Sequence, residues 1–70
     1  MQIKLYEARK RAKLSQQEVA DILGISRNSY GQKERDDVSF NLEEMFTLSE
    51  LLNTSLDDLF IPKSKEGVTK

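Results

Sequence analysis

The chain has 70 residues, 37% of them hydrophobic and 33% charged, which is typical of one small globular domain and not of a disordered or membrane protein. It contains no cysteine and no histidine, which excludes disulfides and thiolate or imidazole metal ligands and removes the commonest general base. We therefore expect a protein that is not an enzyme and holds no metal or cofactor. No apolar stretch long enough for a signal peptide or membrane span precedes the first charged cluster, so we expect a cytoplasmic protein with no membrane partner.

The formal net charge of −1 conceals an uneven distribution along the chain. Residues 1–35 carry eight Lys/Arg against four Asp/Glu, a net charge of +4. Residues 36–70 carry three Lys against eight Asp/Glu, a net charge of −5. Such an asymmetry can indicate a polyanionic partner for the basic half.

Apolar residues recur at helical spacing, and no stretch sustains the alternation of a strand. A first helix is expected over about residues 3–12. Ser15 and Glu18 form a capping box that starts a second helix, which Gly24 ends in the left-handed conformation. The expected buried stripe of this second helix contains Val19, Ala20, Ile22 and Leu23. Ser26 caps a third helix over residues 27–35, and the short turn between the two requires a steep crossing.

Two more helices are expected in the acidic half of the chain. Asn41 and Glu44 form a second capping box, and the helix that follows has a stripe containing Leu42, Met45, Phe46, Leu48, Ser49 and Leu52. Ser55 caps a short fifth helix that ends before Pro62. Residues 1–62 are thus predicted to form one all-α domain of five helices, and residues 63–70 a flexible C-terminal tail.

The third expected helix is unusually polar, with Tyr30 as its one large apolar residue. Its exposed side carries residue types that read base edges in DNA: Arg27, Asn28, Ser29, Gln32 and Lys33. Any solvated helix face is polar, but this one follows a tight turn and is rich in amides and bases. We therefore interpret it as a recognition helix. Gly31 lies in mid-helix, where it either admits a close backbone approach or is a tolerated surface glycine.

The sequence resembles the Cro/C1-type (phage-repressor, XRE-like) helix–turn–helix family over about residues 5–60. The resemblance rests on Leu14-Ser15-Gln16-Gln17-Glu18-Val19-Ala20, Leu23-Gly24-Ile25-Ser26-Arg27, Glu34-Arg35, Leu42-Glu43-Glu44-Met45 and Ser55-Leu56-Asp57-Asp58-Leu59. It implies a lambda-repressor-like fold in which the second and third helices form the helix–turn–helix.

The resemblance also implies roles for individual residues. Gln16 would bind a DNA phosphate together with the N-terminal amides of its helix, and Gln17 would lie beside the groove. The residues that would read bases are Arg27, Asn28 and Gln32, with Ser29 and Lys33 nearer the DNA backbone. Arg9 and Glu34 match a family ion pair that bridges the first and third helices, while leaving Arg9 close to phosphate; the alternative for Arg9 is a solvated surface charge.

Two positions depart from the family pattern. Lys33 replaces a branched aliphatic residue, so we expect its stem to lie over the core and its amine to reach outward. Asp36 and Asp37 occupy a loop that in relatives is often basic and contains glycine. We expect both carboxylates to point away from DNA, leaving neutral contacts to Ser39, Asn41 and the amides that start the fourth helix.

These observations predict a sequence-specific, repressor-like transcriptional regulator that binds double-stranded DNA, as a homodimer on a palindromic operator. One alternative is a protein-interaction module, such as an antitoxin that uses its acidic half and apolar end to bind a protein partner. Another is a degenerate helix–turn–helix that serves as a structural adaptor. Phe60 and Ile61 either form a dimer contact or complete the core.

Overall fold

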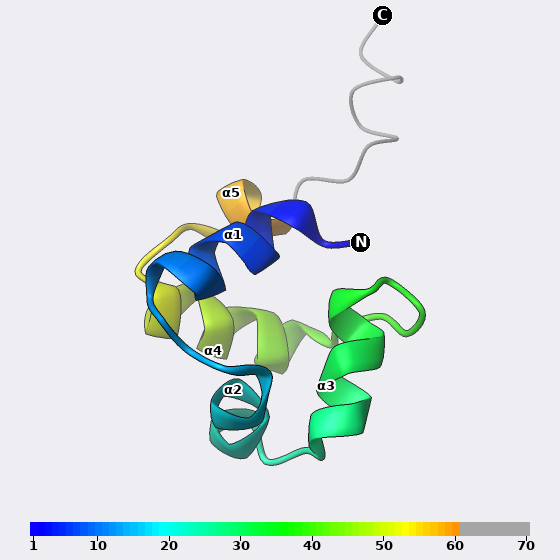
Figure 1. Cartoon of the computed structure of the whole chain (residues 1–70). Helices are drawn as coiled ribbons and strands as arrows, with labels where there is room; N and C mark the ends of the chain where they lie inside the picture. The colour runs from blue at the N-terminus through cyan, green and yellow to red at the C-terminus, as the bar shows by residue number, and fades with distance from the viewer. Residues whose placement is uncertain (61–70) are drawn as a thin grey trace, which may run out of the picture.

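The computed structural model describes residues 1–60, and these form five α-helices and no strand. The helices are α1 (Ile3–Arg11), α2 (Gln16–Leu23), α3 (Arg27–Glu34), α4 (Leu42–Leu52) and α5 (Leu56–Phe60) (Figure 1). The all-α prediction is confirmed, and each of the first three helices ends within a residue of its expected limit. Ile61, Pro62 and the predicted tail at 63–70 lie outside the described residues.

The helix starts follow the side-chain caps that the sequence predicts. Ser15 accepts a hydrogen bond from the Glu18 amide and Glu18 bonds back to the Ser15 amide, so both halves of the first capping box are present. Asn41 and Glu44 do the same at the start of α4. These caps satisfy amides that a helix leaves free at its first turn, and they set where α2 and α4 begin.

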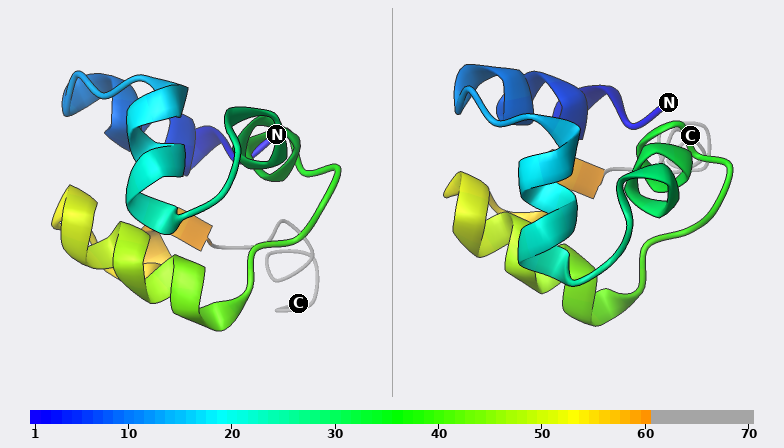
Figure 2. Two further views of the ribbon diagram at one scale, coloured as in Figure 1. Left: turned by 90° about the horizontal axis from the view of Figure 1, so that it is seen from below. Right: turned by 60° about the horizontal axis from the view of Figure 1, so that its bottom comes forward.

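The turn between α2 and α3 is short because Gly24 adopts a left-handed conformation, with φ of 76°. Its amide bonds to carbonyl groups of the last turn of α2, and the Ile25 amide donates to the Ala20 carbonyl at 3.0 Å. Ser26 then caps α3 by accepting from the Ser29 amide at 3.0 Å. The two helices consequently cross within a three-residue connection, as Figure 2 shows.

The core lies where the five helices meet (Figure 1), and each helix contributes to it. Its buried apolar residues are Leu5, Ala8, Val19, Ala20, Tyr30, Phe40, Leu48 and Leu59. The Phe40 ring lies 5.5 Å from the Phe60 ring and 6.0 Å from the Tyr30 ring. Phe60 is partly buried and packs against this core, as one of the two roles considered for it requires.

Three apolar residues that were expected in buried stripes are exposed. Ile22 is 49% exposed, Leu42 60% and Phe46 52%. Phe46 lies about 200° around α4 from the buried Leu48, given about 100° per residue, so the two cannot share one buried side. Ile22 lies on the flank of α2 toward α4, where an open groove separates the helices. The predicted stripes were too wide in both helices.

Candidate nucleic-acid interface

The inner face of α3 is fixed by a buried network centred on the Glu34 carboxylate. Arg9 of α1 donates from Nε to Glu34 Oε2 at 2.8 Å and from its terminal Nη2 to Oε1 at 3.1 Å. The Tyr30 hydroxyl donates to Oε2 at 2.8 Å, and Gln16 Nε2 donates to Oε1 at 2.8 Å. One carboxylate thus joins α1, α2 and α3.

The network changes the acidity of its members. Burial alone would raise the pKa of Glu34, but hydrogen bonds from Arg9, Gln16 and Tyr30 outweigh it and the pKa falls below its ordinary value. The hydrogen bond to Glu34 raises the pKa of Arg9. Burial, followed by the Glu34 carboxylate, raises the pKa of the Tyr30 hydroxyl. Glu34 is therefore held ionised and Tyr30 protonated, the states that the hydrogen bonds require.

Arg9 and Glu34 form the pair that the family resemblance implies, and Arg9 is structural. The Arg9 side chain is buried, and its remaining nitrogen donates to the Leu14 carbonyl at 2.8 Å. The alternative of a solvated surface charge is wrong, because Arg9 is buried. Burial in the pair removes its guanidinium from the surface.

The two glutamines at the start of α2 differ in their surroundings. Gln16 is half-buried, and its amide group is turned toward Glu34 of α3. Gln17 is exposed and donates to Asp21 one turn further along α2 at 2.8 Å. Both lie at the N-terminus of α2, where backbone amides and the helix dipole favour an anion. A phosphate contact from Gln16 has to use or replace its bond to Glu34.

Lys33 is placed differently from the expectation. Its ammonium nitrogen lies 2.7 Å from both carboxylate oxygens of Glu44, and its side chain is 15% exposed. The expected outward-reaching amine is therefore wrong, because the α4 capping box holds the Glu44 carboxylate where Lys33 passes over Phe40. The pair ties α3 to the start of α4, in place of an aliphatic anchor.

The outer face of α3 has a different character. Arg27 and Asn28 are exposed and Gln32 is half-buried. Within residues 1–60 these three side chains form no hydrogen bond and no ion pair, whereas Ser29 Oγ accepts from Ser26 Oγ at 3.0 Å. Donors and acceptors suited to base edges thus stand together on a helix that is fixed from behind.

Gly31 separates this outer face from α2. It is buried although it has no side chain, because neighbouring side chains cover it. A Cβ atom on Gly31 would lie 3.4 Å from Nη1 of Arg35 and 3.7 Å from Oε1 of Gln16. The interpretation as a surface glycine is wrong, and a Cβ at this position would make ordinary van der Waals contacts with these two side chains.

The loop after α3 contains the acidic pair. Asp36 adopts a left-handed conformation with φ of 76° and accepts a hydrogen bond from Gln2 Nε2 at 3.0 Å. Asp37 accepts from Arg35 Nε at 3.2 Å. Ser39 is exposed, and the Asn41 side-chain oxygen is occupied by the Glu44 amide. The carboxylates are thus turned to partners within the chain, Asp36 toward the N-terminus and Asp37 toward α3.

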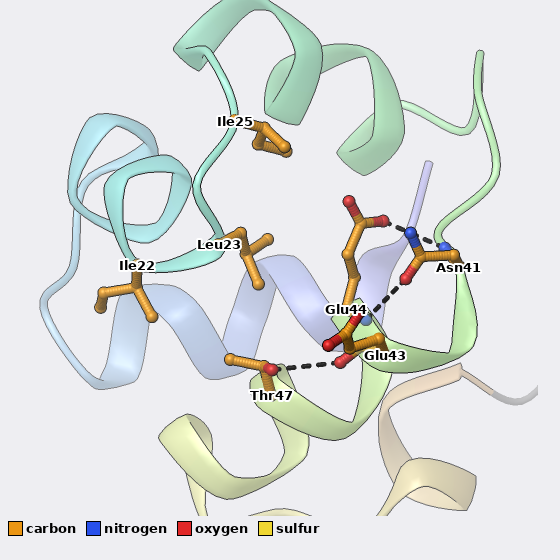
Figure 3. A pocket seen from close by; sticks show the side chains of 7 residues that line it. All are labelled: Ile22, Leu23, Ile25, Asn41, Glu43, Glu44 and Thr47. Atoms are coloured by element: carbon orange, nitrogen blue, oxygen red, sulfur yellow. Dashed lines mark hydrogen bonds between the residues drawn. The ribbon is translucent and has the colours of Figure 1, made fainter.

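An open groove of about 420 Å³ runs between the end of α2 and the first half of α4 (Figure 3). Its lining residues are Ile22, Leu23, Ile25, Asn41, Glu43, Glu44 and Thr47. Figure 3 shows the polar residues of this set on α4 and the apolar ones on α2 and the following turn.

Residues 1–60 contain no group of three or more carboxylates that could hold a metal ion. No helix within the same range is long and apolar enough to cross a membrane.

Sequence reasoning missed two parts of this site. The Tyr30 hydroxyl was interpreted only as part of a core anchor, although its four-residue spacing from Glu34 on one helix face could have indicated the hydrogen bond. Glu44 was interpreted only as a capping residue, and nothing in its local sequence indicates the ion pair to Lys33.

Two helices cross at a tight turn, and the second presents polar side chains that have no partner within the described residues 1–60. This arrangement is typical of the class of helix–turn–helix DNA-binding proteins. A helix-turn-helix family model matches residues 5–59. The chain belongs to the Cro/C1-type helix–turn–helix family, whose members are DNA-binding regulators. No curated protein and no solved structure matches the chain.

Proposed function

We propose that this regulator recognises a specific double-stranded sequence by placing α3 in the major groove, and that it acts as a repressor-like homodimer on a palindromic operator. This role requires the protein to be in the same cellular compartment as its target DNA. Arg27, Asn28 and Gln32 would contact base edges, with Ser29 nearer the DNA backbone. Contacts to phosphates, or to the edge of the groove beside them, would come from Gln16, Gln17, Ser39 and Asn41.

The observation that carries this proposal is the division of α3 into two faces. On the inner face, Glu34 and Tyr30 are buried and hydrogen-bonded to each other, and Glu34 also to Arg9. On the outer face, the side chains of Arg27, Asn28 and Gln32 have no hydrogen-bond partner within residues 1–60. A base-reading side chain must be free to bond while its helix is held in one orientation. Lys33 is not among the proposed DNA contacts, because its ammonium group is paired with the Glu44 carboxylate.

The dimer is supported by apolar surface on α4. Leu42 and Phe46 are spaced by one turn and are both exposed, as is Val38 in the preceding loop. A second copy would cover such residues and present two recognition helices one DNA turn apart, about 10 base pairs. Analytical ultracentrifugation with and without duplex measures the stoichiometry, and Phe46→Ser is expected to weaken any dimer.

The same apolar residues also favour the second candidate function, an antitoxin-like module that binds a protein. Leu42 and Phe46 adjoin the exposed acids Glu43 and Glu50 on α4. A tight protein partner that copurifies and leaves no salt-dependent duplex binding would favour this alternative.

The decisive experiment selects bound duplexes from a random library and then measures affinity by fluorescence anisotropy over a salt series. Arg27→Ala and Gln32→Ala are each expected to cost about 1–3 kcal/mol on the selected site. Arg11→Ala is the matched control, because Arg11 is exposed on α1 and lines a groove between α1 and α5 with Thr54 and Asp58, not with residues of α3. Absence of salt-dependent binding at micromolar protein, or equal losses for Arg11→Ala and Arg27→Ala, would contradict the proposal.

A further inference from the structure

We propose that Asp37 acts as an internal substitute for a DNA phosphate, holding the Arg35 guanidinium and so suppressing the sequence-independent part of DNA binding. The inference rests on the proposed DNA-binding function and adds a role for the acidic loop. It concerns a group of residues that the base-reading set does not include.

The position of Arg35 is the first step. Arg27, Gly31 and Arg35 recur every four residues and therefore follow one side of α3. The Arg35 guanidinium folds back along that side, since its Nη1 lies 3.4 Å from where a Cβ on Gly31 would be. The same point is 3.7 Å from Gln16 Oε1 at the start of α2. Arg35 is thus beside both the base-reading face and the anion-favouring N-terminus of α2.

The position of Asp37 is the second step. Its carboxylate accepts from Arg35 Nε at 3.2 Å, and the two side chains are 61% and 57% exposed. Asp36 is bonded elsewhere, because it accepts from Nε2 of Gln2, the residue before α1. A carboxylate and a phosphate both present oxygen acceptors to a guanidinium, so Asp37 occupies the arginine in the way a DNA phosphate would.

The consequence for binding is the third step. Phosphate contacts contribute affinity that is nearly independent of sequence, while base contacts contribute discrimination. A guanidinium held by Asp37 adds little to binding on random DNA, and the Arg27, Asn28 and Gln32 contacts remain. The sequence-independent part of the affinity therefore falls on every duplex, while the base contacts are unchanged. Because the pair is exposed, it is weak, and releasing Arg35 should alter binding by about two- to five-fold.

The test compares Asp37→Asn with Asp57→Asn, a change of the same charge on the exposed surface of α5. Both proteins are first compared with wild type by circular dichroism and thermal unfolding. Fluorescence anisotropy with random duplex over a salt series is then expected to show tighter binding for Asp37→Asn by about two- to five-fold. Its slope of log affinity against log salt should steepen by about 0.9, as for one added phosphate contact. Asp57→Asn should change neither quantity.

A double-mutant cycle separates release of Arg35 from general repulsion. In an Arg35→Ala background, Asp37→Asn is expected to have no larger effect than Asp57→Asn, because no guanidinium is left to release. The proposal is overturned if Asp37→Asn tightens binding equally with and without Arg35, or if it matches Asp57→Asn in the wild-type background.

A spectroscopic measurement reports on Arg35 directly. In uniformly ¹⁵N-labelled protein, the Arg35 Nε–H signal is expected to move on addition of random duplex in Asp37→Asn and to move far less in wild type. Equal movement in the two proteins would count against the proposal. If wild type binds duplex but these comparisons fail, this inference alone is wrong; if wild type and all variants bind no duplex, the proposed function fails with it.

Discussion

The two faces of α3 carry similar residue types but have opposite surroundings. On the inner face, one carboxylate receives hydrogen bonds from Arg9, Gln16 and Tyr30 and is buried. On the outer face, the side chains of Arg27 and Asn28 are exposed and form no hydrogen bond within residues 1–60. Polar residues on one helix therefore divide into those that fix its orientation and those left for a ligand. A recognition helix needs both groups, because a free side chain reads a sequence only from a fixed position.

The largest expected effect of breaking the inner face is that of Glu34→Ala. This substitution leaves the buried Arg9 guanidinium without its partner, which should lower the free energy of unfolding by about 3–5 kcal/mol. Urea denaturation followed by circular dichroism measures the change. Arg9→Met combined with Glu34→Leu should cost less than Glu34→Ala alone, because both charges are removed. If Glu34→Ala lowers the free energy of unfolding by less than about 1 kcal/mol, as for an exposed pair, the inner face does not fix the helix more firmly than the outer face does.

A smaller effect is expected for Tyr30→Phe, which removes one donor to the Glu34 carboxylate and keeps the ring in the core. Loss of a hydrogen bond to a charged group should reduce the free energy of unfolding by about 1.5–3 kcal/mol. Tyr6→Phe is the matched control, since the Tyr6 hydroxyl forms no hydrogen bond within the described part of the chain. Equal effects of the two substitutions in urea unfolding would show that the Tyr30 hydroxyl is not part of the network.

The pH dependence of stability sharpens the same comparison. The folded-state pKa of Glu34 is lowered, so its contribution is present above the unfolded-state pKa of about 4.3 and is lost as pH falls through the folded value. Free energies of unfolding of wild type and Glu34→Gln, measured from neutral pH down to about pH 3, should converge as the medium is acidified. A constant difference between the two proteins would contradict the lowered pKa.

The smallest stability effects are expected on the outer face. Arg27→Ala and Asn28→Ala should each change the free energy of unfolding by no more than about 0.5 kcal/mol, because neither side chain is buried or bonded within the described residues. Thermal unfolding of the two variants checks this. A loss above about 1 kcal/mol for either would mean that the outer face also holds the fold and is not free for a ligand.

Much of the architecture could be predicted from local patterns. Ser15 with Glu18, Asn41 with Glu44, Ser26 and Gly24 act on backbone groups a few residues away, so their effects on helix limits are visible in a short window. The buried stripes were less predictable. Periodicity identified α2 and α4 as amphipathic but did not show how wide a strip their neighbours cover, and Ile22, Leu42 and Phe46 are exposed as a result.

The candidate site was predicted in part. The polar side of α3 follows from residue types alone, and the Arg9–Glu34 pair came from the family resemblance. The Lys33–Glu44 pair joins residues 11 positions apart and the Gln16–Glu34 bond residues 18 apart. Contacts over such separations depend on how α2 and α4 lie against α3, which periodicity does not specify.

The sequence by itself determined five helices, their caps, the tight turn at Gly24 and a helix rich in the residue types that can bond to base edges, because these depend on neighbouring residues and on composition. Tertiary structure decided which polar side chains bond to other groups of the same protein. It directed Lys33 to Glu44 and Gln16 to Glu34, and left Arg27 and Asn28 outward. The physical reason is that a charge or amide bonds to the nearest complementary group, and only the packed helices establish which group is near.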